Sequence, residues 1–344
     1  MKNIVYILLG FVIFLVQIDY LGAKDYRSID SIMLSCPAQH SQSAESIAKY
    51  IKNTFDSESS RLRAAYSWVA QHICYDLSKM YSGIVYKYEN EVVEQVLKTR
   101  KTICYGYAIT FKTIAESLGI KIIIIKGYTK QNGKIDAIPH AWCAVKLNNE
   151  WKLIDPTWSS GYLSSDAFHK RFDDKWFLVH PDEIIKSHIP FDPVWQFSYF
   201  PINENEFSTG IRSDSVTSRF FSYPDTLNII ETLQEKDLLI AENRRIIDAG
   251  SDNNMISRHV ENNKMRIKNI IHNENVNIYN EAVNLFNLSS SLYNENNWQA
   301  AKLKLDKASK MIENIHNPDK NMSGLIREFR KMINKLNFQI EKML

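Results

Sequence analysis

Three short segments of the chain, KTICYGYAITF, PHAWCAV and WKLIDPTW, limit the folds that it can adopt. The first predicts a helix that starts near Cys104, because apolar residues follow at three- and four-residue spacing and Gly119 is a suitable end. The other two predict neighbouring strands of an antiparallel hairpin. A helix followed by an antiparallel sheet indicates an α+β fold, in which Cys104, His140 and Asp155 have defined places.

Cys104 is the candidate nucleophile. We expect Thr102 to cap its helix, which puts Cys104 in the first turn, where unpaired N–H groups and the helix dipole favour a thiolate. The backbone N–H of Cys104 would also donate to an oxyanion, whereas the sequence identifies no second donor. The spacing to Ala108 and Phe111 places the thiol on the buried side of the helix. The alternative is an inert core cysteine, and the helix start alone favours neither interpretation.

The hairpin gives the cysteine a candidate base and the base a candidate partner. If the turn is Asn148-Asn149, or the four residues 147–150, Lys146 faces Trp151. His140 and Asp155 are then diagonal neighbours on one face, with backbones about 7 to 8 Å apart. Cys143 then points to the other face, which indicates core packing. Taken singly, the histidine is more typical of a core position and the aspartate of a turn before a proline. Their shared face favours a catalytic pair.

Further elements are expected around these segments. Trp68, which lies on the second of two predicted helices, should be part of the protein core. The tyrosine-rich segment over 81–88 is expected to be a surface loop, and the alternative is that it forms the rim of a cleft. In chain order, the expected elements are helices over 47–51 and 62–73, the tyrosine-rich segment over 81–88, a strand over 121–128 and a loop over 131–139.

Taken together, these motifs resemble those of the transglutaminase-like superfamily of papain-type folds. In that family a cysteine at a helix start precedes a histidine and then an aspartate on neighbouring strands, and CYGYA, HAW and DPTW match at Cys104, His140 and Asp155. Residues 68–76 and 176–196 match the flanks, and the second flank is similar to the branch that includes kyphoscoliosis peptidase. The resemblance implies a papain-like core in which a nucleophile helix packs on an antiparallel sheet.

The resemblance covers about residues 45–200 and implies a chemistry. Cys104 would form a thioester with a peptide or amide substrate, His140 would act as base and acid, and Asp155 would orient the imidazole. The family contains proteases, amidases, amine-transferring enzymes and members without activity. Hydrolysis and amine transfer therefore both stay open, and a catalytically silent binding or scaffold protein is the alternative. Family members often carry Asn where this chain has Cys143, a position that faces away from the expected cleft.

Composition excludes several classes of protein. The 344 residues are 44% hydrophobic and 24% charged, which is typical of a globular chain long enough for two domains. A net charge of +3 without a basic stripe argues against a nucleic-acid partner. We expect no metal, because the histidines form no set at ligand spacing, and the segment of His180 and His188 is better explained by packing. No cofactor is expected either, since no glycine-rich phosphate loop is present.

The first residues predict export. Lys2 precedes an uncharged apolar run over 4–18, and Leu21-Gly22-Ala23 resembles a cleavage site, so residues 1–23 are predicted to be a signal peptide. The run is short for a membrane span, which needs about 20 residues. An exported bacterial protein, periplasmic or secreted, is therefore favoured. The alternative is a membrane anchor formed by an uncleaved segment.

Export raises the question of a disulfide. Because Cys104 and Cys143 already have places in the predicted domain, Cys36 and Cys74 are the pair left for a bridge. A domain of this size does not need one, and a buried thiol at Cys74 fits its apolar segment equally well. Whether Cys36 and Cys74 form a disulfide therefore stays open.

The sequence changes character after residue 200. After a catalytic domain over 24–200, residues 201–225 are rich in Asn, Ser and Asp and predict a linker, and residues 226–344 predict a helical domain. Helices over 279–293 and 298–315 form a hairpin with a tetratricopeptide-like pattern, and a last helix follows over 325–344. These helices are either a partner-binding surface or a solvated appendage, and both interpretations stay open.

Overall fold

The structure of the chain is a computed structural model. It describes residues 25–80, 88–212, 220–250 and 253–344. The predicted signal peptide, and all of the tyrosine-rich segment except Tyr88, lie outside the described residues. Among the helices that are described, none is both long and apolar enough to cross a membrane.

Two compact units make up the fold. Of the described residues, the first unit comprises those up to Ile122 together with Asp155–Phe177, and the second comprises Ile123–Ile154 and those from Leu178 onward. Each unit therefore combines two stretches of the chain. Cys104 and Asp155 belong to the first unit, and His140 belongs to the second.

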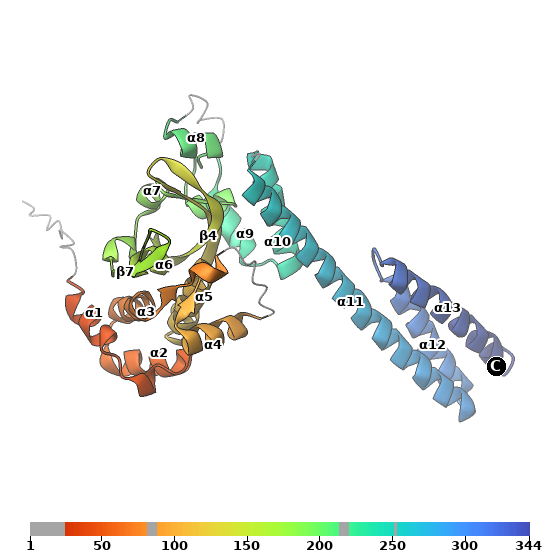
Figure 1. Cartoon of the computed structure of the whole chain (residues 1–344). Coiled ribbons are helices and arrows are strands. Elements are labelled where there is room, and N and C mark those ends of the chain that lie inside the picture. Colours follow the sequence, from red (N-terminus) through yellow and green to blue (C-terminus); the bar gives the residue numbers. More distant parts are fainter. Residues whose placement is uncertain (1–24, 81–87, 213–219, 251–252) are drawn as a thin grey trace, which may run out of the picture. The chain divides into compact units, whose positions relative to one another are not determined.

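The first unit is built around a central helix, α5. Its helices are α1 (Arg27–Leu34), α2 (Ala44–Thr54), α3 (Glu58–His72), α4 (Glu89–Thr99), α5 (Cys104–Ser117) and α6 (Pro156–Ser160). α5 contacts α2, α3, α4 and α6, and most of its side chains are buried (Figure 1). The predicted nucleophile helix is thus present and begins at Cys104. Gly119, which was expected to end it, has a φ of 85°, a conformation that glycine adopts without strain just after a helix.

The predictions for α2 and α3 are confirmed. Ser43 and Ser57 are their N-caps, and each hydroxyl accepts a hydrogen bond of 3.1 Å from the backbone N–H three residues on. Trp68 of α3 is 0% exposed, as its assignment to the core predicted. Its indole N–H donates to the hydroxyl of Ser41 at 3.3 Å, so the ring satisfies its one polar group inside the core.

Two short strand pairs complete the first unit. β1 (Cys74–Tyr75) pairs in parallel with β2 (Lys101–Thr102), just before α5. β6 (Gly161–Ser164) and β7 (Ala167–Lys170) form an antiparallel hairpin after α6. All four cysteines of the chain lie in the described residues, and none forms a disulfide.

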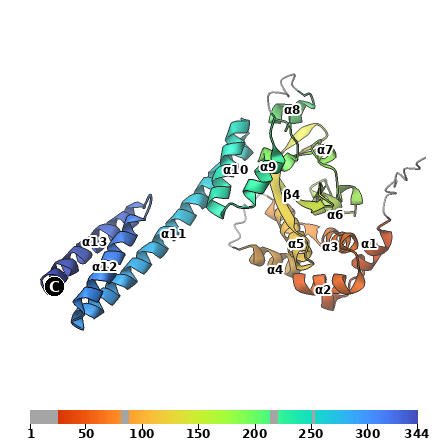
Figure 2. The same cartoon turned by 180° about the vertical axis from the view of Figure 1, so that it is seen from behind.

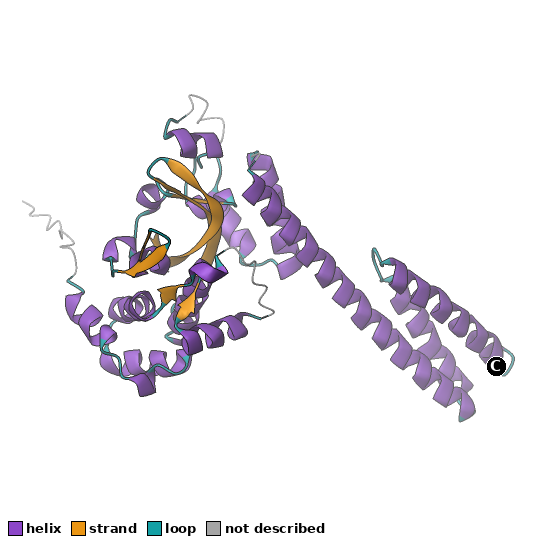
Figure 3. Ribbon diagram, viewed as in Figure 1, coloured by secondary structure: helices purple, strands orange, loops and turns teal. Residues whose placement is uncertain are grey.

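A curled antiparallel sheet is the centre of the second unit (Figure 3). Its strands lie in the order β5 (Glu150–Ile154), β4 (Lys134–Leu147), β3 (Ile122–Gln131) and β8 (His188–Pro190). Asn148 and Asn149 have φ values of 48° and 66° and form the two-residue turn between β4 and β5. Lys146 pairs with Trp151 across this turn, so the register that the sequence predicted is confirmed.

The loop predicted over residues 131–139 is wrong. Asn132 and Gly133, with φ values of 51° and 76°, form a second two-residue turn, and β4 begins at Lys134. Asn-Gly is a strong signal for such a turn, because both positions need a positive φ. The first six residues of β4, over 134–139, are exposed or partly exposed.

Helices supply the rest of the second unit. They are α7 (Pro181–Ile184), α8 (Glu204–Thr209), α9 (Tyr223–Ile230), α10 (Glu235–Ala249), α11 (Asn254–Asn294), α12 (Trp298–Glu313) and α13 (Lys320–Glu341). α8 lies inside the segment for which the sequence predicted a linker. A capping box between Asn203 and Glu206 stabilises its start.

The predicted helical hairpin and last helix are present. α11 turns into α12 at residues 295–297, and α12 and α13 lie beside the C-terminal half of α11 (Figures 1 and 2). Apolar side chains from all three helices form one core, whose buried members include Ala282, Ala301, Leu305, Ile312, Ile326, Phe329, Ile333 and Ile340. The region is therefore a packed three-helix arrangement.

The start of the helical region also packs on the sheet. Ile246 of α10 and Ile256 and Val260 of α11 share a core with Tyr128 and Ile189. Next to this core, Nη2 of Arg245 contacts Oδ2 of Asp192 at 2.6 Å, and both side chains are largely buried. Removal of α10 would therefore leave apolar side chains of β3 and β8 uncovered.

Candidate active site

Cys104 is the first residue of α5 and is 8% exposed. The expected cap at Thr102 is wrong: Thr102 belongs to β2, and the N-cap is Ile103, which forms no side-chain capping bond. Isoleucine has no acceptor in its side chain, so the N-cap residue itself cannot bond the backbone N–H groups of the first turn. The dipole of a helix favours a negative charge near its N-terminus, which is where the side chain of Cys104 lies.

Thr102 instead packs against the first turn of the helix. A Cβ atom added at Gly106 would lie 1.9 Å from Oγ1 of Thr102, much closer than any real contact. The backbone of Gly106 therefore lies directly against the threonine of β2. This packing fixes the start of α5, and with it Cys104, on the β1–β2 pair.

We expect Gly106→Ala to destabilise the chain by about 1–3 kcal/mol, because the methyl group cannot fit beside Thr102. Gly324→Ala is the matched control: it makes the same change inside a helix, but nothing lies within 4 Å of the new Cβ. That substitution should stabilise by about 0.5–1 kcal/mol, as alanine does in a helix interior. Urea unfolding measures both. Equal effects at the two positions would contradict the role given to Gly106.

Asp155 is fully buried at the start of α6. Its Oδ1 accepts hydrogen bonds from the backbone N–H groups of Thr157 at 2.8 Å and Trp158 at 3.1 Å. Its own N–H donates to the carbonyl of Trp176 at 2.9 Å. Asp155 is therefore an N-cap followed by a proline, as the turn alternative predicted, and its carboxylate is also held in one orientation.

The two elements of the first unit that carry Cys104 and Asp155 are neighbours. α5 and α6 contact each other. The first unit therefore packs the helix that begins with the thiol against the helix that the carboxylate caps.

His140 lies in β4 and is 9% exposed. Its ring is nearly parallel to that of Trp142, with centroids 6.1 Å apart, and its centroid is 5.6 Å from that of His188. The Trp142 ring packs on the backbone of Gly127, where an added Cβ would lie 2.7 Å from Cη2. These rings restrict how the imidazole of His140 can turn.

His188 was assigned to packing, and it is indeed fully buried between rings. No pattern in the sequence predicts that it lies beside His140, because the contact depends on the pairing of Thr129 in β3 with His188 in β8. Its Nδ1 is 2.8 Å from the hydroxyl of Ser187. Both histidines carry nitrogens of the kind that bind metal ions.

An α+β fold with a buried cysteine at the start of its central helix, and a buried histidine on a curled antiparallel sheet, defines a class: a papain-type, transglutaminase-like core. Residues 45–156 match the model of the transglutaminase-like superfamily. This segment runs from α2 to the residue after Asp155 and contains all three candidate residues. The family resemblance of the motifs is therefore confirmed over this segment.

Two relatives of known name illustrate the similarity. The chain is 28% identical over 198 residues to kyphoscoliosis peptidase of Mus musculus, an alignment that covers 55% of this chain and 30% of that protein. It is 22% identical over 224 residues to Lim and transglutaminase domain protein ltd-1 of Caenorhabditis elegans, covering 59% and 30%. The chain thus spans about 30% of the length of these relatives.

Solved structures are more distant. A putative cysteine protease from Cytophaga hutchinsonii is 19% identical, with a TM-score of 0.28, and the alignment covers 37% of this chain and 42% of that one. A crystal structure of a TGase is 20% identical, with a TM-score of 0.27, and the alignment covers 47% and 40%.

Proposed function

We propose that this chain catalyses cysteine-dependent acyl transfer on peptide or amide substrates, with Cys104 as nucleophile, His140 as base and Asp155 as the group that orients His140. The observation that carries the proposal is the position of Cys104, the first residue of a largely buried 14-residue helix inside the superfamily match. The dipole and N–H groups of such a helix stabilise a thiolate and then an oxyanion on the substrate.

The hairpin register supports the pairing of His140 with Asp155. Ala144 of β4 pairs with Leu153 of β5, so alternate residues on the two strands share a face. Asp155 follows β5 directly and keeps an extended backbone, with φ −118° and ψ 94°. The alternation therefore continues to Asp155, and both side chains emerge on the face that carries Ala144.

The proposed reaction has two steps. The sulfur of Cys104 bonds to the carbonyl carbon, and the C–N bond breaks as His140 gives the thiol proton to the leaving amine. The thioester is then attacked by water, which gives hydrolysis, or by a second amine, which gives amine transfer. His140 takes the proton of the attacking group, and the thiol is restored.

Labelling with iodoacetamide tests the proposal. At pH 6 a free thiol, with a pKa of about 8.5, is only about 0.3% thiolate. We expect Cys104 to be alkylated at least tenfold faster than Cys36, Cys74 and Cys143, and His140→Ala to remove this advantage, because no imidazolium then stabilises the thiolate. Mass spectrometry of the labelled peptides measures each rate.

His180→Ala is the control, since it removes an exposed histidine whose Nδ1 caps α7 and lies 3.4 Å from Oδ2 of Asp182. It should leave the labelling of Cys104 unchanged. If Cys104 reacts no faster than it does in the urea-unfolded chain, the catalytic proposal is wrong. Fast labelling without acylation by 4-nitrophenyl acetate would support the scaffold alternative instead.

A further inference from the structure

A chain of buried hydroxyl groups leads from α3 to Asp155. The hydroxyl of Tyr66 donates to Oγ of Ser159 at 2.5 Å, and Oγ of Ser159 donates to the carbonyl oxygen of Asp155 at 2.7 Å. All three residues are 0% exposed. Burial raises the pKa of Tyr66 well above its usual range, so this hydroxyl keeps its proton and remains a donor.

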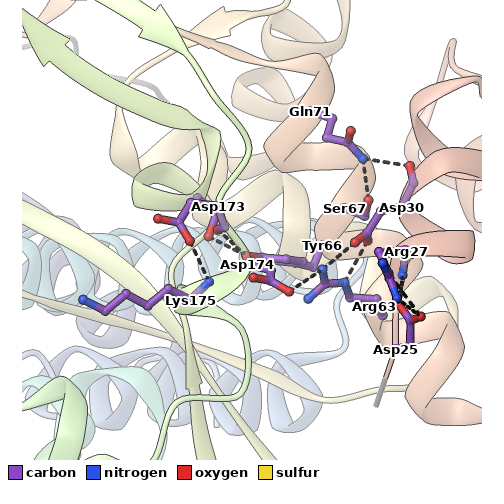
Figure 4. Close-up of polar contacts among 11 residues, drawn as sticks. Asp25, Arg27, Asp30, Arg63, Tyr66, Ser67, Gln71, Asp173, Asp174 and Lys175 are labelled. Carbon is purple, nitrogen blue, oxygen red and sulfur yellow. Dashed lines mark hydrogen bonds and ion pairs between the residues drawn. The ribbon is translucent and has the colours of Figure 1, made fainter. Parts of the chain in front are cut away.

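The same groups tie Asp155 to the segment that follows β7. Tyr66 also approaches the carbonyl of Asp173 at 3.2 Å (Figure 4), and the N–H of Asp173 donates to the carbonyl of Ser159 at 2.9 Å. The N–H of Asp155 bonds to Trp176, and its Oδ1 caps α6. Hydrogen bonds thus hold the amide, the carbonyl and one carboxylate oxygen of Asp155.

We propose that Tyr66 and Ser159 are positioning residues for Asp155, an inference that rests on the proposed function. A buried carboxylate can orient an imidazole only if its own backbone is fixed. Tyr66 has no contact with a reacting atom in this role. It acts by holding the hydroxyl of Ser159, which then fixes the main chain at Asp155.

The chain offers a matched control in Tyr107. It is also 0% exposed, and its hydroxyl donates to the carbonyl of Ile73 at 2.8 Å and accepts from Ser160. Tyr107→Phe therefore deletes a buried hydroxyl of the same kind, bonded to the same helix, without breaking a bond to Asp155. Its effect on stability should be close to that of Tyr66→Phe.

The test compares the rate of Cys104 alkylation by iodoacetamide at pH 6 and pH 9.5 in the full chain. Because pH 9.5 lies above the free-thiol pKa of about 8.5, alkylation there should depend little on a base, so a mispositioned Asp155 should slow the reaction only at pH 6. We expect Tyr66→Phe and Ser159→Ala each to lower the ratio of the rate at pH 6 to the rate at pH 9.5. The expected decrease is about three- to tenfold, the range that the loss of one hydrogen bond gives. The double variant should lose no more than either single one, because both act through one bond chain.

Tyr107→Phe should leave the ratio of rates within twofold of the unmodified chain. If it lowers the ratio as much as Tyr66→Phe, or if Tyr66→Phe leaves the ratio unchanged, the positioning role is wrong. His140→Ala separates this failure from failure of the proposed function. If His140→Ala also leaves the ratio unchanged, the proposed function fails; if it lowers the ratio and Tyr66→Phe does not, only the positioning role fails.

Discussion

Asp155→Asn should slow acylation of Cys104 by about 10²- to 10⁴-fold without unfolding α6. Asparagine is as good an N-cap as aspartate, and its carbonyl oxygen can take the place of the Oδ1 that accepts from Thr157 and Trp158. Its amide then puts a donor where aspartate has its second oxygen. In the proposed mechanism this donor meets an N–H of His140, which favours the wrong tautomer and removes the charge that stabilises the imidazolium.

Release of nitrophenolate from 4-nitrophenyl acetate in a single turnover measures this effect, with Cys104→Ala as the background. Asp319→Asn is the matched control, because Asp319 caps α13 through a bond of 2.8 Å from the N–H of Met322. It should not change the rate. Asp155→Ala should cost about 1 kcal/mol more in stability than Asp155→Asn, since it also loses the cap. Unchanged acylation in a folded Asp155→Asn variant would exclude Asp155 from the reaction.

Arg63→Ala should lower the free energy of unfolding by about 3–5 kcal/mol, which is the usual cost of breaking a buried ion pair from one side. The side chain of Arg63 is 1% exposed, and it bonds both carboxylate oxygens of Asp30, at 2.8 and 2.6 Å (Figure 4). Aromatic rings surround the guanidinium, with centroids 4.7 to 5.5 Å from Cζ, at Tyr26, Tyr66, Phe172 and Phe177. Burial alone would lower the pKa of Arg63, but the bonds and charge of Asp30 raise it, so the arginine stays charged.

An exposed pair next to it provides the control. Arg27 bonds Asp25 with the same two-pronged geometry, at 2.9 and 2.8 Å, but its side chain is 91% exposed (Figure 4). Water and salt screen such a pair, so Arg27→Ala should cause no measurable change. Urea unfolding should show a lower midpoint and an unchanged slope for Arg63→Ala. Similar midpoints for the two variants would mean that the buried pair of Arg63 and Asp30 contributes no more to stability than the exposed pair.

The predictions from the sequence that are confirmed, such as the β4–β5 turn and α5, depend on short-range rules. Two adjacent asparagines set the turn between β4 and β5, and that turn fixed the register of the whole hairpin. Helix periodicity located α5 for a similar reason. The turn at Asn132-Gly133, which was not predicted, follows the same rule, so a sequence signal for it was present in the Asn-Gly pair.

The cap at Thr102 failed for a different reason. Threonine is a good N-cap by local preference, but pairing of β2 with β1 commits it to a strand, and close packing on Gly106 fills the space around its side chain. Tertiary contacts outweighed a local preference whose typical value is only about 1 kcal/mol.

The sequence by itself determined which residues could carry the chemistry and the elements that hold them, because helix starts, turns and strand alternation depend on neighbours a few positions apart. Only the tertiary structure decided what surrounds those residues. Tyr66 and Ser159 are 93 positions apart, Arg63 and Asp30 are 33 apart, and His188 reaches His140 through a strand pairing. Such contacts form because folding buries polar groups that must then find partners, and no local pattern in the chain records which partner each will find.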